Sequence, residues 1–216
     1  MKHPKLKCNS IDQLTSLLLK KIKSNQSGRL MVCIAGAPGS GKSHICSYLL
    51  KKINHSVKQL DVFEMDGFHY DDRILKKKKL IKRKGSPETF DVQGLKSFLI
   101  RLKANKENQV VVPIFDRKLE LSRASAKIIK KKIPLIITEG NYLLLNEKPW
   151  SDLQGYFDLT IMIKSSQKTL SKRLTERWKS FNFSKEIIKQ KVFENDLPNA
   201  KYVYENSMTA DIEFTN

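Results

Sequence analysis

The sequence predicts an α/β fold in which a mostly parallel sheet lies between two layers of helices. Short apolar runs of strand length alternate with segments whose apolar residues recur at helical spacing. The run Ile133–Thr138 is apolar at nearly every position, which is typical of a strand buried on both faces. The run Arg29–Ala35 ends in a glycine-rich segment, and a helical pattern follows it, so strand, loop and helix succeed one another.

The elements of the first half of the chain follow from this spacing. An amphipathic helix with a Ser or Asp cap comes first, and a helix capped by Asp91 comes last. The predicted elements are a helix over 10–23, a strand over 29–35, a helix over 43–53, a strand over 57–65 and a helix over 91–103. The long polar and basic stretch through Glu88 is interpreted as an active-site loop or insertion.

The second half continues the alternation of strands and helices. It predicts strands over 110–114, 133–138 and 158–163, helices over 166–179 and 184–194, and a short last strand over 209–214. We interpret residues 1–216 as one domain. Within it we distinguish an N-terminal helix in 1–28, an acceptor-side loop in 67–90, and lid and C-terminal helices in 166–200.

Composition limits the classes of protein that remain. The 216 residues carry a formal net charge of +19, from 41 Lys and Arg against 22 Asp and Glu, which attracts polyanions without identifying one. The three cysteines form no CxxC pair, so a disulfide framework or a zinc site is disfavoured. There is no run of 18 apolar residues and no apolar secretory signal. We therefore expect no membrane span and a cytoplasmic protein.

The segment GAPGSGKS satisfies the phosphate-binding motif GxxxxGK[ST] in full, and it lies between a predicted strand and a predicted helix. Its glycines allow successive backbone N–H groups and the helix N-terminus to face phosphate groups. Lys42 is expected to reach the β and γ phosphates, and Ser43 to offer a hydroxyl to Mg²⁺. The predicted nucleotide-binding residues are Gly36, Ala37, Pro38, Gly39, Ser40, Gly41, Lys42, Ser43 and His44.

Two acids follow other predicted strands. Asp66 ends the strand over 57–65, and Glu139 ends the strand over 133–138. Ligands of open α/β sheets bind beyond the carboxyl ends of the strands. One carboxylate can take the proton of an acceptor hydroxyl, while another holds Mg²⁺ or its water ligands. The pair therefore suggests phosphoryl transfer.

Other nucleotide-binding classes fit less well. A GTPase is disfavoured because no segment resembles the base-reading motif NKxD. AAA-type and helicase enzymes have larger chains, and they carry two consecutive acids at the end of the corresponding strand. Here Glu139 is followed by Gly140 instead. A small-molecule kinase fits best. Two alternatives stay open: a regulatory or nucleic-acid-associated ATPase, which the net charge suggests, and a scaffold that binds nucleotide without turnover.

Seven segments together resemble the uridine kinase, phosphoribulokinase and bacterial pantothenate kinase superfamily, and most closely its branch of uncharacterised sugar or nucleoside kinases. They cover roughly residues 29–212 in consistent order. The segments are GAPGSGKS, MDGFHYDD, RKGSPETFD over 83–91, VPIFDR over 112–117, TEGNYLLL, RLTERW over 173–178 and NDLPNA over 195–200. The resemblance implies a P-loop NTPase fold with three α/β/α layers, a helical lid, and ATP and Mg²⁺ as cofactors.

The resemblance also implies roles for single residues. Asp66 matches the general base for the acceptor, and Glu139 matches the acid near Mg²⁺, so Ser43 and Glu139 are the expected metal ligands. Catalytic roles are expected for Asp66, Lys42 and Arg177. Residues expected to line the acceptor site are Asp66, His69, Arg83, Asp116, Arg117 and Glu139, whereas Arg173 and Arg177 belong to the lid over the phosphates.

The acceptor itself stays open between a sugar, a nucleoside and a pantothenate-like molecule. Uridine kinases carry an Arg-Asp pair in the lid, but Trp178 follows Arg177 here. Pantothenate kinases share the RKG-P segment in a longer chain. The roles of Asn195 and Asn199 are likewise open between nucleotide, acceptor and their own backbone. We expect ATP and a small-molecule acceptor as partners, and we leave a homodimer open.

Overall fold

A six-stranded parallel sheet forms the centre of the computed structural model, which describes residues 6–25, 28–55 and 59–216. The order of the strands is β1-β8-β7-β2-β6-β3, and every neighbouring pair is parallel. The strands are β1 (Leu6–Cys8), β2 (Leu30–Gly36), β3 (Leu60–Glu64), β6 (Leu135–Gly140), β7 (Leu159–Lys164) and β8 (Ile212–Thr215). The central strands β2 and β6 carry the phosphate-binding loop and Glu139 at their carboxyl ends.

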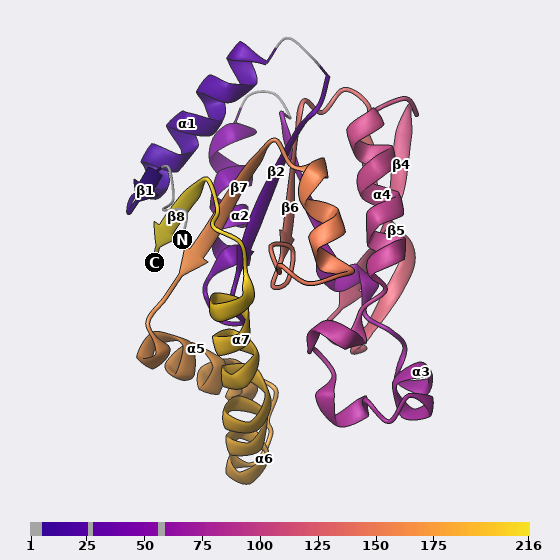
Figure 1. Ribbon diagram of the computed structural model, residues 1–216, viewed down its shortest axis with the longest axis vertical. Coiled ribbons are helices and arrows are strands. Elements are labelled where there is room, and N and C mark those ends of the chain that lie inside the picture. The colour runs from indigo at the N-terminus through magenta and orange to yellow at the C-terminus, as the bar shows by residue number, and fades with distance from the viewer. Residues whose placement is uncertain (1–5, 26–27, 56–58) are drawn as a thin grey trace.

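Successive side chains of the strands pack on opposite faces of this sheet, and helices cover both faces (Figure 1). On one face, Val32 and Ile34 of β2 pack with α1 (Ile11–Ser24) and α2 (Lys42–Ile53). On the other face, Met31 and Cys33 belong to the core formed with α4 (Val92–Ala104). The fold is therefore the predicted three-layer α/β/α arrangement.

The strand predicted over 110–114 exists but does not join the parallel sheet. It is part of β4 (Gln109–Asp116), which pairs antiparallel with β5 (Leu121–Lys130) in a separate two-stranded sheet. The pairing register shifts around Pro113, which lacks the N–H that a regular ladder needs. Val110, Val112 and Ile129 are buried against the α4 core. This hairpin packs against the core around α4 instead of extending the sheet. Strand β5 was not predicted, because half of its side chains are polar and they do not alternate regularly with apolar ones.

The stretch between β3 and α4 contains short helical turns. They are 3₁₀ turns at Met65–Phe68, Ile81–Arg83 and Pro87–Thr89, together with α3 (Asp72–Lys77). The predicted strand over 57–65 corresponds to β3, although its positions 57 and 58 lie outside the described residues. Positions 1–5 of the predicted N-terminal region also lie outside them. Asp91 caps α4 as predicted, because its carboxylate accepts a hydrogen bond from the backbone N–H of Gly94.

The helix predicted over 184–194 is the beginning of a longer helical segment. It comprises α6 (Lys185–Gln190), a π-helical turn at Lys191–Asp196 and α7 (Leu197–Asn206). Pro198 is tolerated because it lies in the first turn of α7. With α5 (Gln167–Ser180), these helices pack on Ala37 of the phosphate-binding loop. Within the described ranges, no helix has both the length and the apolarity needed to cross a membrane.

Candidate active site

The phosphate-binding loop connects the end of β2 to the start of α2. Gly39 and Gly41 have φ angles of 75° and 95°, which are accessible to glycine and strained for other residues. Ser40 is fully buried, and its carbonyl oxygen accepts hydrogen bonds from Arg173 Nη1 at 3.3 Å and from Asn216 Nδ2 at 2.8 Å. The lid helix α5 and the end of β8 therefore hold the loop in place.

Lys42 is the first residue of α2, and only 7% of it is exposed. Its Nζ donates to the carbonyl oxygen of Ala37 at 3.1 Å and to Oδ1 of Asn141 at 2.7 Å. Burial lowers the pKa of Lys42, and the carboxylates of Glu139 and Asp66 oppose that shift. Asn141 was missed in the sequence, although it lies two residues after Glu139. Its side-chain oxygen fixes the ammonium group beside the phosphate-binding loop.

Ser43 and Glu139 lie in direct contact. Ser43 Oγ donates to Glu139 Oε1 at 2.8 Å, across the gap between α2 and the end of β6. The adjacent strand places Glu64 in register with Glu139, so two carboxylates leave the sheet at the same level. Burial first, and the charge of Glu139 second, raise the pKa of Glu64. Glu64 was also missed, although it too lies at a strand end.

Asp66 lies in the 3₁₀ turn that follows β3. This turn packs closely on β4, because a Cβ on Gly67 would lie 2.8 Å from the carbonyl oxygen of Pro113. Arg117, at the end of β4, donates to Asp66 Oδ2 at 2.5 Å. Burial alone raises the pKa of Asp66, but His69 and Arg117 together hold it below its ordinary value. The carboxylate is thus kept ionised beside the phosphate-binding loop.

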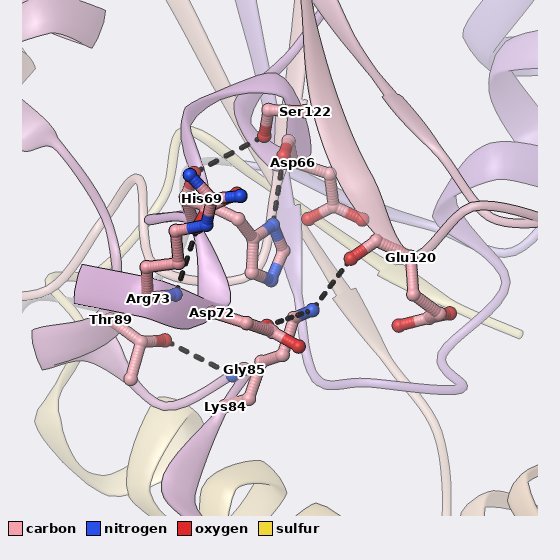
Figure 2. Close-up of polar contacts among 10 residues, drawn as sticks. Asp66, His69, Asp72, Arg73, Lys84, Gly85, Thr89, Glu120 and Ser122 are labelled. Atoms are coloured by element: carbon pink, nitrogen blue, oxygen red, sulfur yellow. Dashed lines mark hydrogen bonds and ion pairs between the residues drawn. The ribbon is translucent and has the colours of Figure 1, made fainter. Parts of the chain in front are cut away.

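His69 is fixed between two aromatic rings. Its ring centroid lies 4.0 Å from that of Phe90 and 4.6 Å from that of Phe115. Its Nδ1 lies 2.8 Å from the carbonyl oxygen of Asp66, and Figure 2 shows this contact beside the Asp66 carboxylate. Burial lowers the pKa of His69, while Asp66 opposes the shift. The imidazole therefore forms one wall of the site next to the candidate base.

Two adjoining hollows meet at Asp66. The first, of about 270 Å³, is lined by the phosphate-binding loop, including Lys42, Ser43 and His44, together with Glu64, Glu139 and Arg173. The second, of about 120 Å³, is lined by His69, Lys84, Phe115, Lys191 and Asn195 among others. Both are also lined by Pro38, Asp66, Arg117, Asn141 and Arg177. We call them the phosphate hollow and the acceptor hollow.

Two predicted acceptor residues lie elsewhere. Arg83 lines a different depression and pairs with Glu88 at 3.5 Å. Asp116 accepts hydrogen bonds from the backbone N–H groups of Lys118 and Leu119, which stabilises the turn of the β4–β5 hairpin. Neither residue lines the phosphate hollow or the acceptor hollow.

Lys84, the neighbour of Arg83, reaches the acceptor hollow instead. Figure 2 shows its ammonium group between Asp72 and Glu120. It donates to Asp72 Oδ1 at 2.7 Å and to the carbonyl oxygen of Glu120 at 2.6 Å. Within the segment RKG, the structure thus places Lys84 at the acceptor hollow and Arg83 away from it.

The lid contributes Arg177 and the segment after α6. Burial, followed by the nearby charge of Arg117, lowers the pKa of Arg177. Asn195 of the π-helical turn donates to the carbonyl oxygen of Lys84 at 3.2 Å, and Asn199 of α7 donates to Asn195 Oδ1 at 3.3 Å. Trp178 Nε1 donates to Asp196 at 2.6 Å. The hydrogen bond of Asn195 joins the lid to the acceptor-side loop, and the other two contacts hold the lid segment together.

Comparison with known proteins concerns the family and the fold of the chain. The model of the Phosphoribulokinase / Uridine kinase family matches residues 31–216. A Schizosaccharomyces pombe protein named "Putative uridine kinase" is 29% identical over 212 residues, which are 94% of this chain and 89% of that protein. Pantothenate kinase of Listeria monocytogenes is 24% identical over 159 residues, which are 72% of this chain and 52% of that enzyme.

One solved structure is especially similar. It is that of a "putative fructose transport system kinase" from Silicibacter sp. TM1040, with a TM-score of 0.88 and 32% sequence identity. The similarity covers 95% of this chain and 99% of that chain. The likeness therefore extends over the sheet, the hairpin and the lid.

Proposed function

The chain belongs to the phosphoribulokinase / uridine kinase family and is a P-loop kinase that transfers a phosphoryl group from ATP to an alcohol group of a small metabolite, and we propose that Asp66 is its general base. The observation that carries this assignment is the meeting of the phosphate hollow and the acceptor hollow at the Asp66 carboxylate. A base must lie within reach of both the acceptor hydroxyl and the transferred group.

The phosphate-binding loop orients the donor. Its backbone N–H groups and the N-terminus of α2 hold the phosphates, and Lys42 neutralises charge on the group that is transferred. Asp66 then accepts the hydroxyl proton as the acceptor oxygen attacks the γ-phosphorus from the acceptor hollow. The bond from that phosphorus to the bridging oxygen breaks, and ADP leaves on the opposite side. Arg177 balances the charge that builds up during transfer, and Arg173 keeps the lid over the phosphates. Positioning and electrostatics supply most of the rate enhancement.

The oxygen atoms of Ser43 and Glu139 suit a Mg²⁺ ion. A hard cation prefers hydroxyl and carboxylate oxygens, and these two are already 2.8 Å apart at the edge of the phosphate hollow. When bound, Mg²⁺ would neutralise phosphate charge there. Glu64, in register with Glu139, would add negative charge that favours the cation.

The acceptor is a sugar, a nucleoside or a pantothenate-like alcohol. The names of the similar proteins, which mention uridine, fructose and pantothenate, support these three classes. Within the site, His69, Lys84 and Arg117 are the residues that we assign to acceptor binding, in place of Arg83 and Asp116. We propose that the protein works in the cytoplasm, where ATP and small metabolites are both present.

The test is a panel of sugars, nucleosides and pantothenate, each incubated with ATP and Mg²⁺ and scored by the mass of the product. We expect one class to gain a single phosphate. In a Lys42→Ala variant both nucleotide affinity and transfer should fall. ATP hydrolysis without a phosphorylated acceptor anywhere in the panel would contradict the assignment.

A further inference from the structure

Asn141, the residue that follows β6, lies in the wall between the two hollows of the site. It lines both the phosphate hollow and the acceptor hollow, together with Pro38, Asp66, Arg117 and Arg177. In the proposed reaction the phosphoryl group passes from one hollow to the other, so a polar side chain in this wall lies beside the path of that group. The proposed reaction assigns Asn141 no contact with either substrate.

The backbone on both sides of Asn141 is fixed by close packing. A Cβ on Gly140 would lie 2.5 Å from the Cβ of Met65, so the end of β6 packs directly on the turn that carries the candidate base. Tyr142 is fully buried, and its hydroxyl donates to the carbonyl oxygen of Gly85 at 2.5 Å. A side chain between two such anchors is presented from a rigid position, as a catalytic contact requires.

The contact with Lys42 fixes which way the amide of Asn141 is turned. An ammonium group can only donate, so the atom that lies 2.7 Å from Lys42 Nζ must be the amide oxygen. The carbonyl oxygen of Ala37 accepts a second hydrogen bond from the same group, at 3.1 Å. An ammonium group has three N–H donors, and these two acceptors leave one of them for a phosphate oxygen.

The amide nitrogen of Asn141 remains available. Nδ2 is bonded to the same carbon as Oδ1, so it lies beside the Lys42 ammonium in the wall of the two hollows. Within the part of the chain that the structure describes, it has no hydrogen-bond partner. It is not an enclosed atom either, since the buried polar atoms without a partner do not include it. Its N–H donors are therefore accessible to a ligand in the hollows.

A neutral donor beside a lysine suits one part of the nucleotide in particular. The N–H groups of the phosphate-binding loop hold the α and β phosphates, whereas the γ-phosphoryl group is the part nearest to the acceptor. During transfer, negative charge spreads over the three equatorial oxygens of that group. A preorganised N–H donor directed at one of these oxygens stabilises the charge without any reorganisation at the moment of reaction.

We propose that Asn141 is a catalytic residue that contacts the γ-phosphoryl group of ATP, an inference that rests on the proposed phosphoryl transfer. Its Nδ2 donates a hydrogen bond to a γ-phosphate oxygen, and its Oδ1 holds Lys42 so that the remaining N–H of the ammonium reaches the same group. Asn141 thus distinguishes ATP from ADP, because ADP lacks the group that Nδ2 contacts.

The test compares two nucleotides in the absence of any acceptor. Calorimetry gives the affinities of a non-hydrolysable ATP analogue and of ADP, both with Mg²⁺, for the parent protein and for Asn141→Leu. We expect the affinity for the ATP analogue to fall by roughly tenfold or more, as for a lost hydrogen bond to a charged group, while the affinity for ADP changes by less than about twofold. Asn146→Leu is the matched control, because Asn146 is exposed and lines neither hollow, and it should bind both nucleotides as the parent protein does.

A second measurement observes the amide of Asn141 directly. In the ¹⁵N-labelled parent protein, the side-chain NH₂ signals of Asn141 are identified by their absence from the spectrum of Asn141→Asp. We expect these signals to shift when the ATP analogue binds and to stay near their original position with ADP. The proposal is overturned if Asn141→Leu loses affinity for both nucleotides equally or for neither, or if the NH₂ signals respond equally to both nucleotides or to neither. Because no acceptor is present, these results are independent of the acceptor panel, whose failure would contradict the kinase assignment alone.

Discussion

Asp66 lies in a strongly polarised environment. Its side chain is half-buried, at 23% exposure. Four nearby groups favour its ionised form and lower its pKa, namely His69, Arg117, Lys42 and Arg177. A general base needs a free lone pair on the acceptor side, and Arg117 occupies only one of the two carboxylate oxygens, Oδ2. In the proposed mechanism, the other oxygen is left for the substrate hydroxyl.

The first prediction concerns this carboxylate. Asp66→Asn should lower phosphoryl transfer by about two orders of magnitude or more, because an amide cannot accept the hydroxyl proton. Affinity for ATP, measured by calorimetry, should be nearly unchanged, since the loop and Lys42 remain. Asp152→Asn is the matched control, because Asp152 lies near Lys96 and away from both hollows of the site. Full turnover in Asp66→Asn would remove Asp66 from the role of base.

The second prediction concerns the pH dependence of the rate. The base acts when deprotonated, and its pKa is held below the ordinary value of 3.8, so Asp66 should not limit the rate between about pH 5 and 8. Arg117→Gln removes one of the charges that lower this pKa. The pKa of Asp66 should then rise, and the acid limb of kcat/KM for the acceptor should move to higher pH.

Arg123→Gln is the control for that shift. Arg123 lies on the neighbouring strand β5, and its guanidinium contacts Asp116 at 3.3 Å instead of Asp66. Its acid limb should coincide with that of the parent protein. An identical shift in both variants would mean that net surface charge, and not the contact with Asp66, sets the pH profile.

At the scale of elements, the π-helical turn connects the lid to the acceptor side. A π-helical turn shifts the register of a helix by one residue and often lies at a functional site. Here it places Asn195 against the backbone of the acceptor-side loop, at a sequence separation of 111 residues. The hydrogen bond fixes the carbonyl of Lys84, whose side chain lines the acceptor hollow.

The third prediction tests this connection. Asn195→Ala removes a hydrogen bond to the loop, so KM for the acceptor should rise by roughly two- to tenfold, whereas KM for ATP should stay constant. Steady-state kinetics with the acceptor found by the panel provide the measurement. Asn206→Ala is the matched control, because Asn206 lies on the same helical segment and its side chain donates within that segment, to the carbonyl oxygen of Tyr202. Equal changes in both KM values would indicate a general loosening of the lid instead.

Most regular elements could be predicted from the sequence, and the exceptions share a cause. Strands β2, β6 and β7 are nearly continuous apolar runs because both faces are buried, and that pattern is visible locally. Strand β5 has one buried position, Ile129, and its remaining side chains are half-buried or exposed. Its pairing with β4 is decided by the partner strand and by the turn at Asp116, which apolar spacing does not reveal.

At the scale of the whole molecule, the net charge of +19 is the most conspicuous global property. Part of it lies on α3 and the residues that follow, where Lys76 and Lys77 are exposed. A field of this kind attracts polyanions at low ionic strength whatever the enzyme does. Binding to nucleic acid would therefore not by itself indicate a function.

The fourth prediction separates charge from function. Affinity for a mixed-sequence DNA duplex should fall steeply with salt, and K76Q/K77Q should show a shallower dependence of affinity on salt concentration. Phosphoryl transfer should be the same in K76Q/K77Q as in the parent protein, because neither residue lines the phosphate hollow or the acceptor hollow. Stimulation of ATP hydrolysis by the duplex would instead favour a nucleic-acid-associated ATPase.

The sequence by itself determined the features that depend on neighbouring residues. The phosphate-binding loop is eight consecutive residues, the buried strands are continuous runs, and Asp66 and Glu139 follow strands whose carboxyl ends must meet at one edge of a parallel sheet. The family resemblance added the residues of the lid.

Only the tertiary structure decided which side chains face one another across distant segments. Arg83 and Lys84 are adjacent in the chain, yet they line different hollows, because the direction of a side chain in an irregular turn depends on what packs on each side of it. The hydrogen bond from Asn195 to the backbone of Lys84 likewise joins segments that are far apart in the sequence, and no local pattern encodes such a contact.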